Sequence, residues 1–170
     1  MMLRVSLHND LTDAPIMTPK TLLAASAFLL ISSVLHAQWL SRMSSPLPLW
    51  ADSALVQSGF WGSYDLSSRI SPQLALADLD GDGLSDLAVS IVDRGGRRRG
   101  IAIVHQIDRS VHVLGAGQPV ENGPDQLPIT ASWNVAKLLG HRAGVLVVGW
   151  HTSALIVWNG HTYVWVQNSE

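Results

Sequence analysis

The sequence predicts an all-β domain, an antiparallel meander that is either sandwich-like or a partial propeller, with one short helix. Apolar runs after residue 72 are short, rich in Val and Ile, and bounded by Gly, Asp or Asn, which is typical of strands. Tight turn signals separate these runs, as expected for hairpins. No period of 40–50 residues repeats, so one chain cannot form a full propeller.

Composition supports one packed domain. The chain has 170 residues, of which 47% are hydrophobic and 14% charged, which allows a packed core and disfavours global disorder. The net charge of −2 gives no basic face for nucleic acid, and no nucleic-acid partner is expected. Because cysteine is absent, disulfides and thiolate metal sites are excluded, and stability must come from the core or a bound metal.

The N-terminal part has the plan of a secretory signal peptide over residues 1–37. Lys20 precedes an apolar run from Leu22 to Leu35, and Ala37 offers a small residue for cleavage before Gln38. Met17 is a better start than Met1, because the first sixteen residues carry two aspartates. The alternative is an uncleaved membrane anchor, since about 20 apolar residues can span a bilayer.

Three segments follow from this plan: the leader, a linker at 38–49, and one β-domain at 50–170. Two prolines and two serines between residues 44 and 48 disfavour helix and sheet. The protein is expected to be secreted or periplasmic, or else anchored through its N-terminus. Contact with a membrane is expected only through an uncleaved leader.

Seven strands are predicted in order, at Gln73–Ala77, Leu87–Asp93, Gly100–Gln106, Val111–Leu114, Val145–Trp150, Ala154–Trp158 and Thr162–Gln167. Hairpin turns are expected at Arg94–Arg99, at Asp108-Arg109 and at 151–153.

The clearest turn signal is Asn159-Gly160, which favours a two-residue type I′ turn. Such a turn pairs Trp158 with His161. In the same register Ala154 lies opposite Trp165.

A long connection is predicted over Gly115–Thr130, which holds three prolines. The one helix is predicted at Ala131–Leu139. Ser132 is its expected N-cap and Gly140 its expected stop.

An acidic loop, Asp78-Leu79-Asp80-Gly81-Asp82-Gly83-Leu84-Ser85-Asp86, carries the chemistry. Its carboxylates stand at positions 1, 3, 5 and 9, and would repel one another without a cation. Calcium prefers six to eight oxygen ligands, and the glycine at position 6 permits a sharp turn. The pattern predicts a Ca²⁺ site with Asp78, Asp80, Asp82, the carbonyl of Leu84, and Asp86.

The loop is not an EF-hand. Position 12 of an EF-hand is a bidentate glutamate, and here that position is Val89. The flanking segments are strand-like rather than helical. The alternative interpretation is an Asp/Gly-rich turn without a specific ligand.

The pattern resembles the FG-GAP or VCBS-type repeat of integrin α-chain propellers and many secreted bacterial proteins. The resemblance covers Leu74–Val104 as strand, loop, strand, glycine-rich turn and strand. It implies calcium ligands at the same five loop residues, whereas Ser90-Ile91-Val92 departs from the family's Gly-Ala-Pro element. The downstream part is similar to small single-repeat exported bacterial proteins.

Three further features have two interpretations each. His141, His151 and His161 form either a transition-metal site or ordinary turn residues. Trp150, Trp158 and Trp165 form either a binding platform or core. The basic run from Arg94 to Arg99 is either an anion-binding cluster or a solvated hairpin tip.

We therefore expect a non-enzymatic, calcium-stabilised exported module that binds a protein or carbohydrate partner at the cell envelope. Two alternatives remain at this point. One is a secreted hydrolase whose catalytic residues have no recognisable motif, and the other is a structural subunit that completes a larger propeller.

Overall fold

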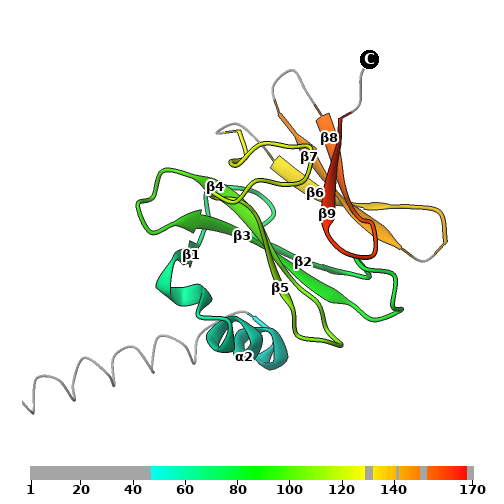
Figure 1. Ribbon diagram of the computed structural model, residues 1–170, viewed down its shortest axis with the longest axis horizontal. Coiled ribbons are helices and arrows are strands. Elements are labelled where there is room, and N and C mark those ends of the chain that lie inside the picture. The colour runs from blue at the N-terminus through cyan, green and yellow to red at the C-terminus, as the bar shows by residue number, and fades with distance from the viewer. Residues whose placement is uncertain (1–46, 129–131, 141, 150–152, 168–170) are drawn as a thin grey trace, which may run out of the picture. The chain divides into compact units, whose positions relative to one another are not determined.

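The computed structural model describes residues 47–128, 132–140, 142–149 and 153–167, which all lie in one compact unit (Figure 1). The predicted signal peptide and most of the predicted linker lie outside the described residues. The elements are α2 (Leu49–Gln57), the 3-10 turn η1 (Phe60–Gly62), β1 (Tyr64–Leu66), β2 (Leu74–Ala77), β3 (Asp86–Asp93), β4 (Arg99–Val104), β5 (Val111–Gly115), β6 (Ser132–Lys137), β7 (Ala143–Val148), β8 (Ser153–Trp158) and β9 (Tyr163–Gln167).

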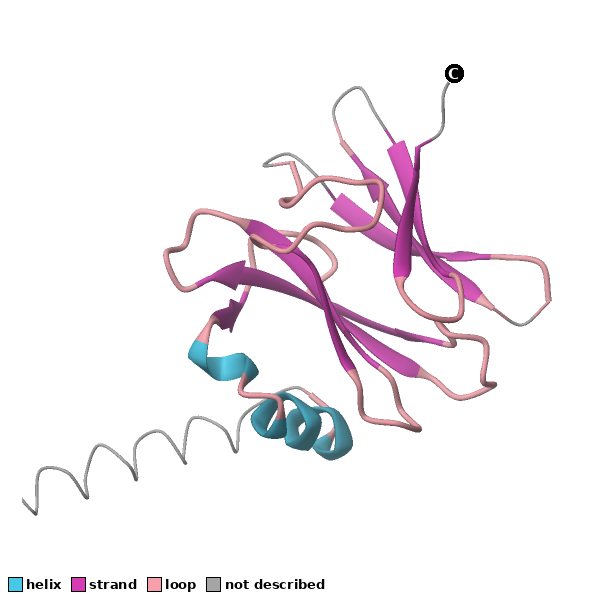
Figure 2. Ribbon diagram, viewed as in Figure 1, coloured by secondary structure: helices cyan, strands magenta, loops and turns pink. Residues whose placement is uncertain are grey.

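The strands form two antiparallel sheets, which Figure 2 shows as two separate groups of arrows. Sheet A has the order β1-β3-β4-β5, with β2 also paired to β3, and sheet B has the order β6-β7-β8-β9. Every sequential pair from β2 to β5 and from β6 to β9 is antiparallel. The predicted all-β meander is confirmed, with each of the seven predicted strands present within one or two residues at its described ends.

Sheet A is covered on both faces, so β3 is buried on both faces from Asp86 to Ile91. Alternate residues of a strand point to opposite faces. Leu87, Val89 and Ile91 pack in a cluster with α2, whereas Ala88 packs in a second cluster that includes residues of sheet B. The unbroken apolar run of β3 follows from this position between two apolar layers.

Sheet B packs against sheet A through side chains such as Val145, Val147 and Ile156, which are all buried. Trp133 of β6 is also buried, and its indole Nε1–H donates a 2.7 Å hydrogen bond to the Ser90 hydroxyl of β3. That bond satisfies the one polar atom that a buried tryptophan carries. The two sheets thus share one core with a polar tie through its centre.

The helix predicted at Ala131–Leu139 is wrong, because Ser132–Lys137 is strand β6. Trp133 is buried and its neighbours Ser132 and Asn134 are exposed, which is the two-residue alternation of a strand. Pairing with β7 over six residues outweighs the local capping signal. Tertiary contact thus decides this segment against its local preference.

The folded unit begins earlier than predicted. Leu47 is buried, and α2 starts at Leu49, inside the segment assigned to the linker. The buried residues Ala51, Ala54 and Leu55 have helical spacing, and Pro48 at the N-cap lies where proline is tolerated. Among the described residues, no helix has the length and apolar character needed to cross a membrane.

The turn at Asn159-Gly160 is wider than the predicted type I′ turn. Trp158 pairs with Tyr163, so four residues lie between β8 and β9. The Asn159 side-chain oxygen accepts 2.9 Å hydrogen bonds from the amides of His161 and Thr162, which stabilises this wider loop. The predicted register is therefore wrong, because Trp165 lies opposite Ile156 instead of Ala154.

Candidate metal site

The acidic loop joins β2 to β3, with Ala77 paired to Asp86 at its base. Its carboxylates fold back onto the loop's own backbone. Asp78 accepts hydrogen bonds from the amides of Gly81 at 2.7 Å and Gly83 at 3.1 Å. Gly81 and Gly83 both have positive φ, which glycine adopts without strain. The loop is therefore a curled turn of defined shape.

Asp78, Asp80 and Asp82 each bring a carboxylate oxygen within 4.8 Å of the other two. Asp78 and Asp80 are half-buried and Asp82 is exposed. Oxygen atoms gathered in this way offer the hard ligands that a divalent cation prefers. The structure thus brings together three of the five predicted ligands, close enough to bind a metal ion.

Asp86 has a different setting, since it is fully buried. Its Oδ2 accepts hydrogen bonds from the amides of Leu79 at 2.9 Å and Asp80 at 3.2 Å. Its Oδ1 accepts one from the amide of Gln106 at 2.9 Å. Asp86 therefore ties the start of the loop to the end of β4.

The pKa of Asp86 is raised above its ordinary value. Burial is the main cause, because it disfavours the charged form. The amides of Gln106 and Leu79 act in the opposite direction, and the nearby Asp80 carboxylate raises the pKa further. A cation in the loop would favour the charged form of Asp86.

Leu84 contributes its amide, which donates a 2.7 Å hydrogen bond to the Asp82 carboxylate. Its side chain is 42% exposed, so it has no packing role in the core. Among the predicted ligands, Asp86 groups with Asp80 and not with Asp78 and Asp82. The third member of that second group is His105.

His105 was not singled out from the sequence. It is buried, its Nε2 lies 2.8 Å from the Tyr163 hydroxyl, and its Nδ1 lies 3.5 Å from an oxygen of Asp80. Ile101 and Ile103 share its face by the two-residue period of a strand, and both are core residues. That alternation, applied to the predicted strand, is the signal that could have placed His105 in the core.

A cluster of aromatic rings surrounds His105. Trp158 meets it edge-on with centroids 4.9 Å apart, and His112 lies 4.6 Å away. Burial lowers the pKa of His112 to about 4, with a smaller contribution from His105 in the same direction. Burial likewise raises the pKa of Tyr163. His112 and Tyr163 are therefore neutral over a wide range of pH, as a packed interface between sheets requires.

The hydroxyl group of Ser110 contacts both histidines. Its Oγ lies 3.1 Å from Nδ1 of His105 and 3.0 Å from Nε2 of His112. In a Ser-His-Asp triad the serine and the acid occupy opposite ring nitrogens. Here Ser110 and Asp80 both face Nδ1 of His105, so the three side chains are not in triad order.

The acidic loop also contacts sheet B. The amide of Ala143 donates a 2.7 Å hydrogen bond to the carbonyl oxygen of Asp78. The Arg142 side chain lies over Gly81, where an added Cβ would come within 2.8 Å of its Nε. Arg142 in turn donates a 2.7 Å hydrogen bond to the Trp158 carbonyl. The loop thus links sheet A, which holds its base, to sheet B.

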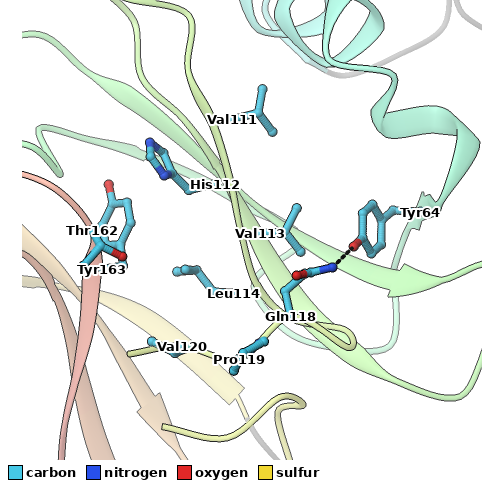
Figure 3. A pocket seen from close by; sticks show the side chains of 10 residues that line it. All are labelled: Tyr64, Val111, His112, Val113, Leu114, Gln118, Pro119, Val120, Thr162 and Tyr163. Atoms are coloured by element: carbon cyan, nitrogen blue, oxygen red, sulfur yellow. Dashed lines mark hydrogen bonds between the residues drawn. The ribbon is translucent and has the colours of Figure 1, made fainter. Parts of the chain in front are cut away.

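A pocket of about 370 Å³ lies along β5, between that strand and the start of β9 (Figure 3). Its lining contains no aspartate, glutamate, lysine or arginine side chain. Tyr64 closes one side, 3.4 Å from the amide nitrogen of Gln118. The lining residues are Tyr64, Val111, His112, Val113, Leu114, Gln118, Pro119, Val120, Thr162 and Tyr163.

The remaining histidine and tryptophan predictions are resolved in part. His141, His151 and Trp150 lie outside the described residues, so the possible transition-metal cluster is not described. Trp158 and Trp165 are half-buried and pack against the shared core, which supports the core interpretation for these two rings.

No protein-family model matches this chain, and no curated protein or solved structure shows significant similarity to it. The resemblance to the FG-GAP or VCBS-type repeat therefore depends on the loop residues and on their position between two antiparallel strands.

Proposed function

We propose that this protein is a calcium-stabilised β-module that binds a partner and has no catalytic role. One observation carries the proposal: Asp78, Asp80 and Asp82 group their carboxylates in a loop that is bonded to both sheets. A cation held there would fix the shape of the loop that connects β2 to β3 and that accepts a hydrogen bond from sheet B. The metal is thus assigned a structural role.

Calcium is the cation that best suits these ligands. The three side chains offer only oxygen, which favours a hard ion over Zn²⁺. Backbone carbonyls and water would complete the six to eight ligands that Ca²⁺ takes. Because the site is partly exposed, we expect a dissociation constant of about 10⁻⁴ to 10⁻³ M, as in extracellular modules.

Partner binding is assigned to the pocket along β5. Its lining combines two tyrosines with the Gln118 amide and the Thr162 hydroxyl, and such groups recognise neutral polar ligands. A protein or carbohydrate partner of an exported protein fits this chemistry. The signal peptide predicted from the sequence supports export, and an exported module would meet the millimolar calcium that a site of this affinity needs.

Thermal unfolding with calcium and with a chelator tests the metal. We expect calcium at roughly ten times its dissociation constant to add about 1.4 kcal/mol, which raises the melting temperature by roughly 4–6 °C. Asp80→Asn should remove most of this gain, whereas the exposed Asp125→Asn should keep it. Equal melting temperatures for the unmutated chain with calcium and with chelator would refute the proposal.

A structural subunit is the second candidate, favoured by the outer face of sheet B. Leu146, Leu155 and Val166 lie in one row across three strands, and Val166 is 46% exposed. Apolar rows of this kind are often covered in assemblies. Light scattering on the purified chain distinguishes the candidates, since this alternative predicts a stable oligomer that Leu155→Lys dissociates.

A further inference from the structure

A second pocket, of about 190 Å³, lies at the opposite end of β3 from the acidic loop. Its lining comes from the end of β1 and the segment that follows it, from the end of β3, and from the β3–β4 hairpin with the start of β4. Hydrogen-bond donors dominate its polar side chains, and it contains no carboxylate. The lining residues are Leu66, Ser67, Ser68, Arg69, Val92, Gly96 and Arg99.

Ser67 supplies a buried donor. Its side chain belongs to a residue that is only 7% exposed, and its Oγ accepts a 3.2 Å hydrogen bond from the amide of Arg69. No described residue accepts the hydrogen of this hydroxyl. Buried hydroxyl groups are normally satisfied, so this one has a donor to offer to a ligand in the pocket.

Arg69 supplies a cation without a counter-ion. No carboxylate among the described residues lies within ion-pair distance of it. The second guanidinium, Arg99, enters from β4, thirty positions along the chain. The sequence pointed to the run from Arg94 to Arg99, but it could not show that Arg69 joins this cluster.

The neighbouring hairpin strengthens the positive potential. Arg94 and Arg97 are exposed, and the guanidinium of Arg94 donates to the Trp61 carbonyl rather than to a carboxylate. The carboxylate of Asp93 offsets one charge, since it accepts from the side chain of Arg98 at 3.3 Å. The pocket thus lies in a net positive field that attracts anions.

We propose that this pocket binds the anionic group, a sulfate, phosphate or carboxylate, of a charged glycan. A set of donors with no acceptor carboxylate matches a group that only accepts hydrogen bonds, and guanidinium forks suit such oxyanions. Leu66 and Val92 provide apolar walls for the face of a sugar ring. Residues Arg94 and Arg97 lie where a second anionic group of the same polymer would reach.

A glycan fits better than a membrane surface. Stable binding to a bilayer combines electrostatic attraction with apolar side chains that enter the interface beside the basic ones. The loop Arg94–Arg98 contains only arginine and glycine, so it offers nothing to insert. This anion site is a second binding site, separate from the pocket along β5, and it rests on the proposed function only in treating the chain as a binding protein.

Calorimetric titration of the full chain with a heparin-derived tetrasaccharide tests the proposal. We expect binding that Arg69→Gln weakens by about tenfold, as the loss of one charge-assisted contact predicts. Arg109→Gln removes an equal charge from an arginine that lies over Trp50, and should retain the affinity. Equal weakening by both variants would mean non-specific charge attraction, and would overturn the proposal.

Ser67→Ala separates a built pocket from a basic patch, because it leaves the charge unchanged. We expect a loss of about threefold to tenfold in affinity, with an unchanged circular dichroism spectrum. An affinity equal to that of the unmutated chain would contradict the assignment of Ser67. If Ser67→Ala fails to fold, Ser68→Ala takes its place, with a smaller loss expected because Ser68 is exposed.

Binding measurements with other ligands identify the source of the anionic group. Inorganic sulfate should compete with the tetrasaccharide, and neutral maltotetraose should not bind. Binding to phosphatidylglycerol vesicles without binding to the tetrasaccharide would overturn the glycan assignment in favour of a membrane. Titrations with calcium and with chelator should give the same affinity while the fold persists, so failure of the calcium proposal and failure of this one remain distinguishable.

Discussion

At each end of β3 an aspartate accepts hydrogen bonds from backbone amides of a loop, but the two aspartates lie in different surroundings. At the start of β3, Asp86 accepts hydrogen bonds from three backbone amides and holds the acidic loop against the end of β4. At its end, Asp93 accepts the amides of Arg97 at 2.8 Å and Arg98 at 2.9 Å, and so closes the basic hairpin. Each aspartate satisfies loop donors that have no strand partner.

Their pKa values nevertheless move in opposite directions. The pKa of Asp93 is lowered, chiefly by the hydrogen bond from the Arg98 amide. The pKa of Asp86 is raised because burial outweighs its amide hydrogen bonds. Hydrogen bonds from amides therefore do not by themselves decide the charge of a carboxylate, since the effect of lost solvent can exceed theirs.

The largest expected difference between the two ends is in stability. Asp86→Ala leaves three amides without an acceptor, of which one is buried and two are part-buried, and each such loss at a buried position costs about 1–3 kcal/mol. We expect a loss of about 3 kcal/mol, which is a large fraction of the stability of an ordinary domain. Asp93→Ala should cost clearly less, because water can reach its loop. Urea unfolding followed by tryptophan fluorescence measures both variants.

The conservative variant Asp86→Asn serves as the control. It keeps one carbonyl acceptor and the same volume, so we expect a stability between those of the unmutated chain and Asp86→Ala. If Asp86→Ala and Asp93→Ala have equal unfolding midpoints, the two ends are equivalent and the comparison fails.

Much of this architecture follows from local pattern, and the rest depends on contacts that only the fold supplies. The strand β3 and its acidic loop can be predicted from the sequence, because the apolar run, the turn glycines and the spacing of the carboxylates are local signals. The strand nature of β6 is not, since Ser132 and Gly140 also suit a helix and only pairing with β7 decides. The role of His105 requires Tyr163, which lies 58 residues away.

The candidate metal site divides in the same way. The grouping of Asp78, Asp80 and Asp82 could be predicted, because neighbours at alternate positions of a curled loop converge. The burial of Asp86 could not, because it depends on the amide of Gln106, which lies 20 residues along the chain. Local spacing identifies ligands, whereas long-range packing decides which of them become structural.

The second-largest expected effect is a pH dependence of stability caused by His112, which lies near the end of β3 that carries the acidic loop. Its folded pKa of about 4 lies below the 6.5 of the free side chain, so the unfolded chain binds more protons between these values. Stability should therefore fall as the pH drops from 6.5 towards 4, by about 1–2 kcal/mol once solvent access is allowed for.

Chemical unfolding across this pH range checks the effect. His112→Gln should flatten the slope, and the exposed loop residue His161→Gln should not. If His112→Gln leaves the slope of stability against pH unchanged, the folded protein accepts a proton on His112 at no cost. That result would contradict the claim that burial lowers the pKa of His112.

The smallest expected effect is the contribution of the Asp93 charge to stability, and it concerns only the end of β3 that carries the basic hairpin. Because its folded pKa is lowered, the charged carboxylate stabilises the fold above the ordinary aspartate value of 3.8, and that contribution is lost as the pH falls below it. Asp93→Asn should therefore lower the melting temperature slightly at neutral pH, and the difference from the unmutated chain should close in acid. The exposed Asp65→Asn, on the neighbouring β1, should show no such closing. A gap for Asp93→Asn that stays constant with pH would mean that the Asp93 charge has no part in closing the hairpin, and that amide geometry alone is sufficient there.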